Sequence, residues 1–218
     1  MNQKNQSDKY FSIFLSVLAF LFLYIVQQSP LLLLNYAIKY HLDKDPTLNL
    51  FISIAFVIIT ILVTVIFICM HKRTQAFKDT RLTYQSWIYI IAAIIITLIV
   101  NFGLLPFMKT TGNENVAAQT RIIQSFPYVF YFFALIIAPI TEEIIYRSYF
   151  INWFFKDHLY LGVMVGAILF GLSHLSHDPV YFLSKFLLGL VLGFVYIKNR
   201  NIKASMIVHF INNFLALI

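Results

Sequence analysis

Two adjacent carboxylates and an arginine, Glu142, Glu143 and Arg147, stand inside an otherwise apolar stretch of the chain. A charged side chain near the centre of a bilayer costs about 2.5–3.5 kcal/mol on insertion scales. In a helix, Glu143 and Arg147 are i and i+4 and are expected to pair. Glu142 points about 100° away, to a different part of the helix surface, and remains available for other work. The alternative is a structural ion pair at a helix start capped by Thr141, which leaves Glu142 unexplained.

A histidine follows a segment that is rich in small residues. Phe170 and His174 lie one turn apart at the end of this segment. Small residues let helices approach closely, which is expected to bring His174 towards a neighbouring helix. They are Gly162, Gly166, Ala167 and Gly171. A histidine near a helix end is also a common capping residue, and His177, which precedes Asp178-Pro179, fits that role better than His174 does.

The last apolar segment carries a second histidine. His209 and Asn213 are i and i+4, so an imidazole and a carboxamide point the same way, while Asn212 is turned about 100° from Asn213. Such a pair can also simply join two helices, at roughly 0.6–2 kcal/mol. Taken together, two acids, an arginine, two histidines and an amide recur at helix-face spacings in three of the last four apolar segments. This combination indicates a catalytic site rather than helix–helix contacts alone.

The elements that must position these groups are membrane helices. Of 218 residues, 60% are hydrophobic and only 11% are charged, and the mean hydropathy is +0.80. Lipid offers no hydrogen bonds to bare backbone, so each apolar span is expected to be a helix. The net charge of +7 is spread over short loops, which fits membrane topology and argues against a nucleic-acid partner. Cys69 is the only cysteine, which excludes an intrachain disulfide and a Cys-based metal site.

Seven apolar segments organise the chain. They run approximately over Tyr10–Leu34, Leu48–Met70, Tyr84–Phe107, Phe126–Phe155, Leu159–Leu175, Val180–Ile197 and Ala204–Ile218, with breaks at His41–Thr47, His71–Thr83, Lys109–Gln119 and Ser176–Pro179. Asp178-Pro179 is expected to open the sixth helix. Pro139 predicts a kink or a broken helix within the fourth. We therefore predict an all-α, polytopic bundle of about seven membrane helices, with N-terminal helices in residues 1–121 and a catalytic core in residues 122–218.

Basic residues assign the two sides of the membrane. One side carries Lys4, Lys9, Lys72, Arg73, Lys78, Arg81, Lys156, Lys198, Arg200 and Lys203; the other carries Lys39, Lys44, Lys109, Arg121 and, in the fifth loop, Lys185. The positive-inside rule then predicts a multi-pass cell-membrane protein with a cytoplasmic N-terminus and an outward C-terminus. In this topology, His174 and His209 reach the same depth only if the fifth helix is short or tilted.

The three spacings resemble those of a known family. They are EExxxR (Glu142, Glu143, Arg147), FxxxH (Phe170, His174) and HxxxN (His209, Asn213). They occur in the order found in the CPBP family of intramembrane endopeptidases, which includes the type II CAAX prenyl proteases and Abi-like bacteriocin-processing or immunity proteins. The resemblance covers roughly residues 126–218, and the first three segments show no such motif.

The resemblance implies hydrolysis of a peptide bond in a membrane-associated peptide or protein. By analogy with the family, Glu142 and His174 would activate a water molecule. His209 and Asn213 would stabilise the oxyanion, where one donor is worth roughly 3 kcal/mol. The supporting residues would be Glu143, Arg147 and Phe170. The roles of the two glutamates can also be exchanged.

Zinc is the alternative to a site without a cofactor, because the family is often described as metalloproteases. Its ligands would be Glu142, His174 and His209. The chain has no HExxH motif, however, and the ligands would come from three separate helices. Asn213 is also a poor zinc ligand. A glutamate-activated water without a metal is therefore the first choice.

Two other kinds of function compete with peptide hydrolysis. One is a non-catalytic membrane partner, such as a bacteriocin-immunity protein or a regulatory scaffold that binds its client. The other is a small transporter in which an acid, an arginine and a histidine relay protons. For the preferred endopeptidase, the expected partners are a membrane peptide or protein substrate and the lipid bilayer.

Overall fold

The computed structural model describes residues 3–74, 81–109, 113–174 and 176–217, and within these ranges the chain is helical without any strand. Five helices are long and apolar enough to cross a membrane, and two shorter apolar helices accompany them. The prediction of an all-α polytopic bundle is therefore confirmed. Three predicted positions, Lys78, Leu175 and Ile218, lie outside the ranges given above.

The helices follow the seven predicted segments, with one addition. They are α1 (Gln3–Lys39), α2 (Pro46–Thr74), α3 (Tyr84–Leu104), α4 (Glu114–Ser125), α5 (Pro127–Phe132), α6 (Ala138–Glu143), α7 (Asn152–Phe154), α8 (Leu159–Leu172), α9 (Pro179–Asn199) and α10 (Ile202–Leu217). Short 3₁₀ turns, η1 (Leu42–Lys44) and η2 (Leu105–Phe107), follow α1 and α3. Within the fourth segment, π-helical stretches η3 (Phe133–Ile137) and η4 (Ile144–Ile151) alternate with α5, α6 and α7.

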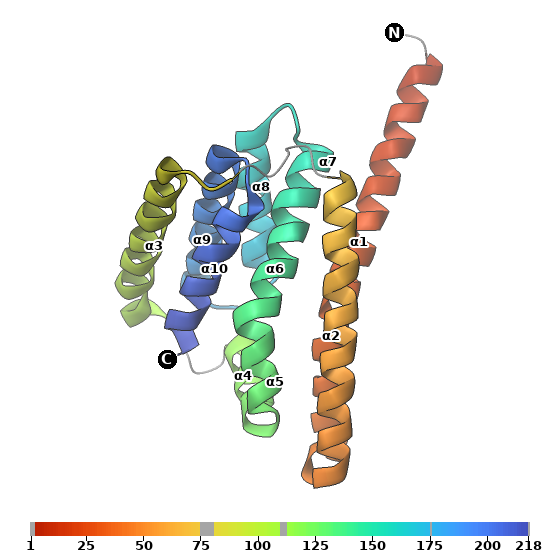
Figure 1. Cartoon of the computed structure of the whole chain (residues 1–218), viewed down its shortest axis with the longest axis vertical. Helices are drawn as coiled ribbons and strands as arrows, with labels where there is room; N and C mark the ends of the chain where they lie inside the picture. The colour runs from red at the N-terminus through yellow and green to blue at the C-terminus, as the bar shows by residue number, and fades with distance from the viewer. Residues whose placement is uncertain (1–2, 75–80, 110–112, 175, 218) are drawn as a thin grey trace.

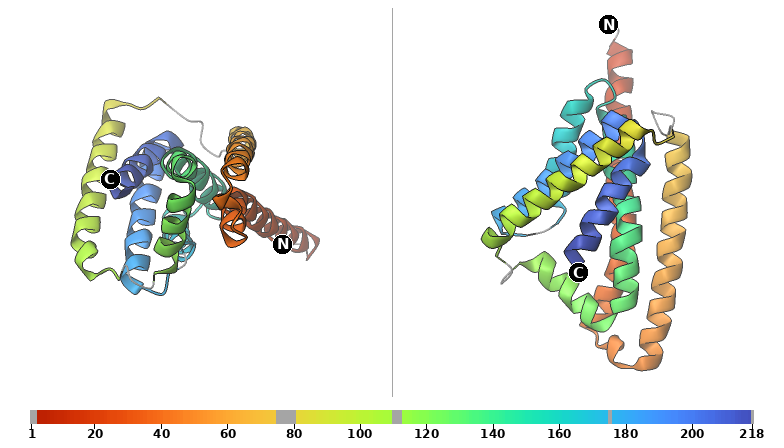
Figure 2. Two further views of the ribbon diagram at one scale, coloured as in Figure 1. Left: turned by 90° about the horizontal axis from the view of Figure 1, so that it is seen from below. Right: turned by 60° about the vertical axis from the view of Figure 1, so that its left-hand side comes forward.

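The C-terminal helices pack around α9, which contacts α8, α3 and α10. Figure 2 shows α3 lying alongside α9 on one side of the bundle. The α1–α2 pair packs against the fourth segment, and the N-terminal end of α1 extends beyond the other helices (Figure 1). In Figure 1, the N-terminal end of α1 lies at the top of the molecule, and α10 ends on the side away from α1, in the lower half of the view. Which end faces the cytoplasm stays a prediction.

The fourth segment is one continuous helix over residues 127–154. Of the two alternatives that Pro139 predicted, the broken helix is therefore wrong, while the kink stays a prediction. The helix instead widens into π-helical turns over residues 133–137 and 144–151. Pro139 has no N–H group, so it cannot donate a hydrogen bond to the carbonyl one turn earlier. The wider π-helical turn accommodates this missing hydrogen bond while the helix continues. The carboxylates of α6 therefore sit between two π-helical stretches, a geometry that is frequent at functional sites.

A short helix lies where the sequence predicted a break over Lys109–Gln119. This helix, α4, begins inside the predicted break, at Glu114. The side-chain Oδ1 of Asn113 accepts hydrogen bonds from the backbone N–H groups of Asn115 (3.1 Å) and Val116 (3.2 Å). This is a standard helix N-cap. Hydropathy missed α4 because the helix is amphipathic and too polar to be read as a membrane span.

The small residues of α8 allow the close approach to α9 that the sequence predicted. A Cβ atom added to Gly189 of α9 would lie only 3.0 Å from the Cα of Ala167 in α8. The helix α8 has 14 residues, or a length of about 21 Å, against about 30 Å for a bilayer core. The expectation of a short fifth helix is therefore confirmed, and His174 follows directly after its end.

Candidate active site

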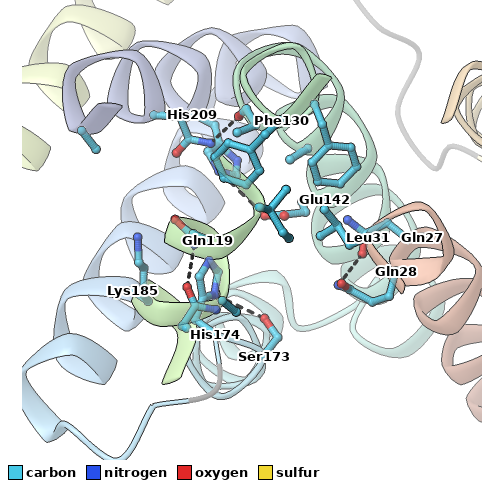
Figure 3. A pocket seen from close by; sticks show the side chains of 18 of the residues that line it. Gln27, Gln28, Leu31, Gln119, Phe130, Glu142, Ser173, His174, Lys185 and His209 are labelled. Atoms are coloured by element: carbon cyan, nitrogen blue, oxygen red, sulfur yellow. Dashed lines mark hydrogen bonds and ion pairs between the residues drawn. The ribbon is translucent and has the colours of Figure 1, made fainter. Parts of the chain in front are cut away.

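A cavity of about 250 Å³ brings together all four residues that were predicted to be catalytic. Glu142 comes from α6, His174 from the turn after α8, and His209 and Asn213 from α10. The cavity lies between two apolar clusters, since Leu188 of one and Ile122 of the other both line it. Figure 3 shows Glu142, His174 and His209 around this space.

The second glutamate, Glu143, is fully buried and paired. Its Oε1 lies 3.2 Å from Nη1 of Arg147 and 3.0 Å from Nδ1 of His209. The exposed fractions of the Glu143 and Arg147 side chains are 0% and 2%. The predicted i, i+4 ion pair is therefore confirmed, and it also holds one edge of the His209 ring.

Arg147 is held by main chain and by aromatic rings as well. Its Nη2 donates to the carbonyl oxygen of Gly189 at 3.0 Å, and its guanidinium lies 5.0 Å from the ring centroid of Phe170. The Phe170 ring in turn contacts the rings of His174 (4.7 Å between centroids) and His209 (5.7 Å). Phe170 thus joins the buried ion pair to both histidines, which explains its place in the FxxxH motif.

Glu142 differs from its neighbour because it faces the cavity. Its side chain is 18% exposed, and its Oε2 lies 3.8 Å from Nε2 of His209. His209 therefore stands between the two carboxylates, with Nδ1 towards Glu143 and Nε2 towards Glu142. A carboxylate that is open to the cavity can exchange a proton with a molecule bound there, whereas Glu143 has no such access.

The orientation of His174 is set by its own helix. Its Nδ1 lies 2.7 Å from the carbonyl oxygen of Phe170, and a carbonyl can only accept a hydrogen bond. Nδ1 therefore carries the proton, and Nε2 of the neutral ring is left as an acceptor. A ring fixed in this tautomer can take a proton from a group in the cavity.

Asn213 is the end of a chain of amide hydrogen bonds. Asn101 of α3 donates to Oδ1 of Asn212 at 2.9 Å, and Asn212 donates to Oδ1 of Asn213 at 3.2 Å. Nδ2 of Asn213 then donates to the carbonyl oxygen of Ala134 at 2.9 Å. Its spacing predicted only that Asn212 is turned away from Asn213, and the structure shows that it meets α3. The second N–H of the Asn213 amide is not used by these bonds.

Several cavity residues were not predicted from the sequence. Amides from α1 and α4 line the cavity at Gln27, Gln28, Asn35, Asn115 and Gln119, together with Tyr24. The residues of α1 recur at i, i+3, i+4 and i+11, which places polar groups on one face of an apolar span, and this signal could have indicated their role. Lys185 also lines the cavity. It was assigned to a loop, but it lies within α9.

The loop before α9 carries polar contacts, but the cap that was predicted for His177 is supplied by Asp178. Nδ1 of His177 lies 2.6 Å from Oε1 of Glu114 at the start of α4, and the His177 side chain is 92% exposed. Asp178 caps α9 by accepting from Val180 N–H at 3.0 Å and also accepts from Lys109 N–H at 2.8 Å. The bond from the Lys109 backbone is the main reason why the pKa of Asp178 lies below its ordinary value.

The residues present do not form a metal site. In the part of the chain that the structure describes, no three His, Cys, Asp or Glu side chains are grouped closely enough to hold a metal ion. Glu142 approaches Nε2 of His209 at 3.8 Å, but among the described residues no third ligand is grouped closely with this pair. This arrangement does not fit a three-ligand zinc site, and metal dependence stays a prediction.

Comparison with known proteins agrees with the motifs. Residues 124–215 match the family described as type II CAAX prenyl endopeptidase Rce1-like. The UPF0177 protein YbdI of Lactococcus lactis subsp. lactis (strain IL1403) is 28% identical to the chain over 168 residues, which cover 73% of this chain and 91% of YbdI. No solved structure matches the chain. The match to this family of CAAX-type endopeptidases thus covers the C-terminal region, which carries the three motifs and supplies Glu142, His174, His209 and Asn213 to the cavity.

Proposed function

We propose that the protein is an endopeptidase that hydrolyses a peptide bond of a membrane-associated peptide or protein. The observation that carries this proposal is the contrast between the two glutamates. Glu143 is buried in an ion pair, while Glu142 opens onto a cavity that it shares with His174 and His209. This arrangement supports Glu142, rather than Glu143, as the carboxylate that meets the substrate.

In the first step, the Glu142 carboxylate accepts a proton from a water molecule, and the water oxygen attacks the carbonyl carbon of the scissile bond. His174 assists as a second hydrogen-bond acceptor for the water through Nε2, because its Nδ1–H donates to the Phe170 carbonyl. The tetrahedral intermediate then collapses as the C–N bond breaks. The leaving nitrogen takes the proton from Glu142, which releases an amine and a carboxylic acid and restores the Glu142 carboxylate. The acid product then loses its proton to water.

The negative oxygen of the tetrahedral intermediate needs donors. One candidate is the second side-chain N–H of Asn213, which the hydrogen bond to Ala134 does not use. The other is His209 with a proton on Nε2. Glu143 orients His209 through Nδ1, so it acts as a positioning residue. Loss of one such donor typically lowers kcat by about 10²–10³-fold.

The test is cleavage of hydrophobic peptides by the full chain reconstituted in lipid. Glu142→Gln and His174→Ala are expected to lower kcat by about 10²–10⁴-fold, as for loss of a general base. Glu114→Gln changes a carboxylate on the surface of α4 and serves as the matched control. Undiminished cleavage by Glu142→Gln at normal expression would overturn the assignment.

A protection assay in cells distinguishes this proposal from a non-catalytic immunity or scaffold function. If the protein protects cells from a bacteriocin by binding a client, Glu142→Gln is expected to protect as well as the wild type does. Loss of protection together with loss of cleavage supports the endopeptidase.

A further inference from the structure

A lysine lines the same cavity as the proposed catalytic residues, where the Glu142 carboxylate attracts it without forming an ion pair within 4 Å. Lys185 lies in the second turn of α9 and is partly buried. Its Nζ lies 5.2 Å from the ring centroid of Tyr181, one turn earlier. Among the residues that the structure describes, no carboxylate lies within 4 Å of this ammonium group.

The charges around the cavity explain why this lysine stands out. Arg147 is matched by Glu143, and His209 stands between Glu143 and Glu142. Half of the remaining polar lining residues are amides from α1 and α4. Amides can bind the backbone of an extended peptide whatever its sequence, because they both donate and accept. Of the lining residues described, Lys185 alone offers a fixed positive charge to a ligand.

Neighbouring residues determine the position of Lys185. Tyr181, which lies beside the ammonium group, donates its hydroxyl hydrogen to Oδ1 of Asn115 at 2.9 Å and so connects α9 to α4. A lysine near the end of a membrane helix usually extends its chain towards the membrane surface. Here the side chain lines the cavity instead. Figure 3 shows Lys185 on the other side of the cavity from Gln27 and Gln28, with Glu142 between them.

We propose that Lys185 binds an anionic group of the peptide substrate and thereby sets where the chain is cut. This inference rests on the proposed endopeptidase function. The chemistry fits a carboxylate, for which a lysine acts as a compact point charge. The carboxylate is either the free C-terminus of the peptide or the side chain of an Asp or Glu. With the anion held by Lys185, the chain extends past Glu142 towards the amides of α1.

The test uses three fluorescently labelled hydrophobic decapeptides with one common sequence. The first ends in a free carboxylate, the second in an amide, and the third in an amide after a single Asp near the C-terminus. Binding to the full chain in nanodiscs is measured along with cleavage, for the wild type, Lys185→Gln and Lys185→Arg. Thermal unfolding of each variant checks that it is folded.

The wild type is expected to bind at least one carboxylate-bearing peptide about 10-fold or more tightly than the amidated peptide. Lys185→Gln should remove this preference, and Lys185→Arg should keep most of it. Preference for the first peptide identifies the C-terminus as the anion, and preference for the third identifies a side chain. Equal binding of all three by the wild type, or an equal loss for all three in Lys185→Gln, would show that Lys185 only balances Glu142 and would overturn the inference.

This design distinguishes failure of the proposed anion site from failure of the proposed endopeptidase function. A wild type that binds with the carboxylate preference but cuts none of the peptides supports the anion site and counts against the endopeptidase. Cleavage of all three peptides at equal rates and with equal affinities supports the endopeptidase and counts against the anion site.

Discussion

The first three membrane helices and the C-terminal helices are surrounded by different environments. In the most apolar 18-residue stretches of α1, α2 and α3, 11%, 22% and 17% of the residues are buried, against 50% in the helix over residues 127–154 and 50% in α9. The first group is therefore largely left for lipid to cover, and the second is enclosed by protein. The buried ion pair lies in the enclosed group, because only there can other side chains replace water around a charge.

The comparison also shows where the two regions cooperate. The helix α1 is mostly exposed, yet its polar face lines the cavity at Gln27, Gln28 and Asn35. The lipid-facing region thus adds substrate-facing amides to a site whose charges come from the C-terminal helices. The following predictions test this division of roles, from the largest expected effect to the smallest.

Replacement of Arg147 by Gln should be the most damaging of these changes. It leaves the Glu143 carboxylate buried without its guanidinium partner, which typically costs about 3–5 kcal/mol. Thermal unfolding in detergent measures the effect. Arg121→Gln, an exposed position on α4, is the control and should stay within about 0.5 kcal/mol of the wild type. Similar shifts for the two variants would contradict the view that the enclosed region depends on this ion pair.

Gly189→Ala should destabilise the contact between α8 and α9. The added Cβ would lie 3.0 Å from the backbone Cα of Ala167, and overpacking of this kind costs about 1–3 kcal/mol. Gly103→Ala in α3 is the matched control, because no atom lies within 4 Å of the Cβ that it would add. The control should be neutral or slightly stabilising in the same unfolding measurement. A stable Gly189→Ala variant would show that the two helices can separate at little cost.

Gln28→Leu should weaken substrate binding without unfolding the protein. It removes one amide from the cavity side of α1, and a lost hydrogen bond of about 1 kcal/mol corresponds to roughly a 5-fold rise in KM. The readout is steady-state cleavage of the decapeptides. Gln124→Leu, on an exposed position of α4, is the control. An unchanged KM in Gln28→Leu would mean that α1 acts only as a membrane anchor.

The contact between α4 and the loop before α9 should weaken in acid. Hydrogen bonds from the Glu114 backbone N–H and from His177 hold the pKa of the Glu114 carboxyl below its ordinary value of 4.5. A carboxyl with a lowered pKa stabilises the folded state fully above pH 4.5, and this contribution is lost as the pH falls through the lowered value. The difference in thermal unfolding between the wild type and Glu114→Gln should therefore be present at pH 6 and disappear towards pH 3. A difference that persists at pH 3 would argue against this titration.

Spacing along the sequence was enough to predict some of these features. Glu143 and Arg147 pair because i and i+4 share a helix face, whatever surrounds the helix. The seven apolar segments became helices because lipid leaves the backbone no other partners. The short fifth helix also followed from the need for His174 and His209 to meet. These are local properties of a chain in a membrane.

Tertiary packing decided the rest. Glu142 and Glu143 are neighbours in the sequence, and only the position of α10 determines that one meets the cavity while the other is buried beside His209. Lys185 falls inside the predicted segment Val180–Ile197, but only the packing of α9 brings its side chain into the lining of the cavity. The cavity residues of α1 are more than 100 positions from Glu142 in the chain. Contacts between such distant residues depend on how whole helices pack. The polar face of α1 could indicate that its residues do not face lipid, but not which residues they meet.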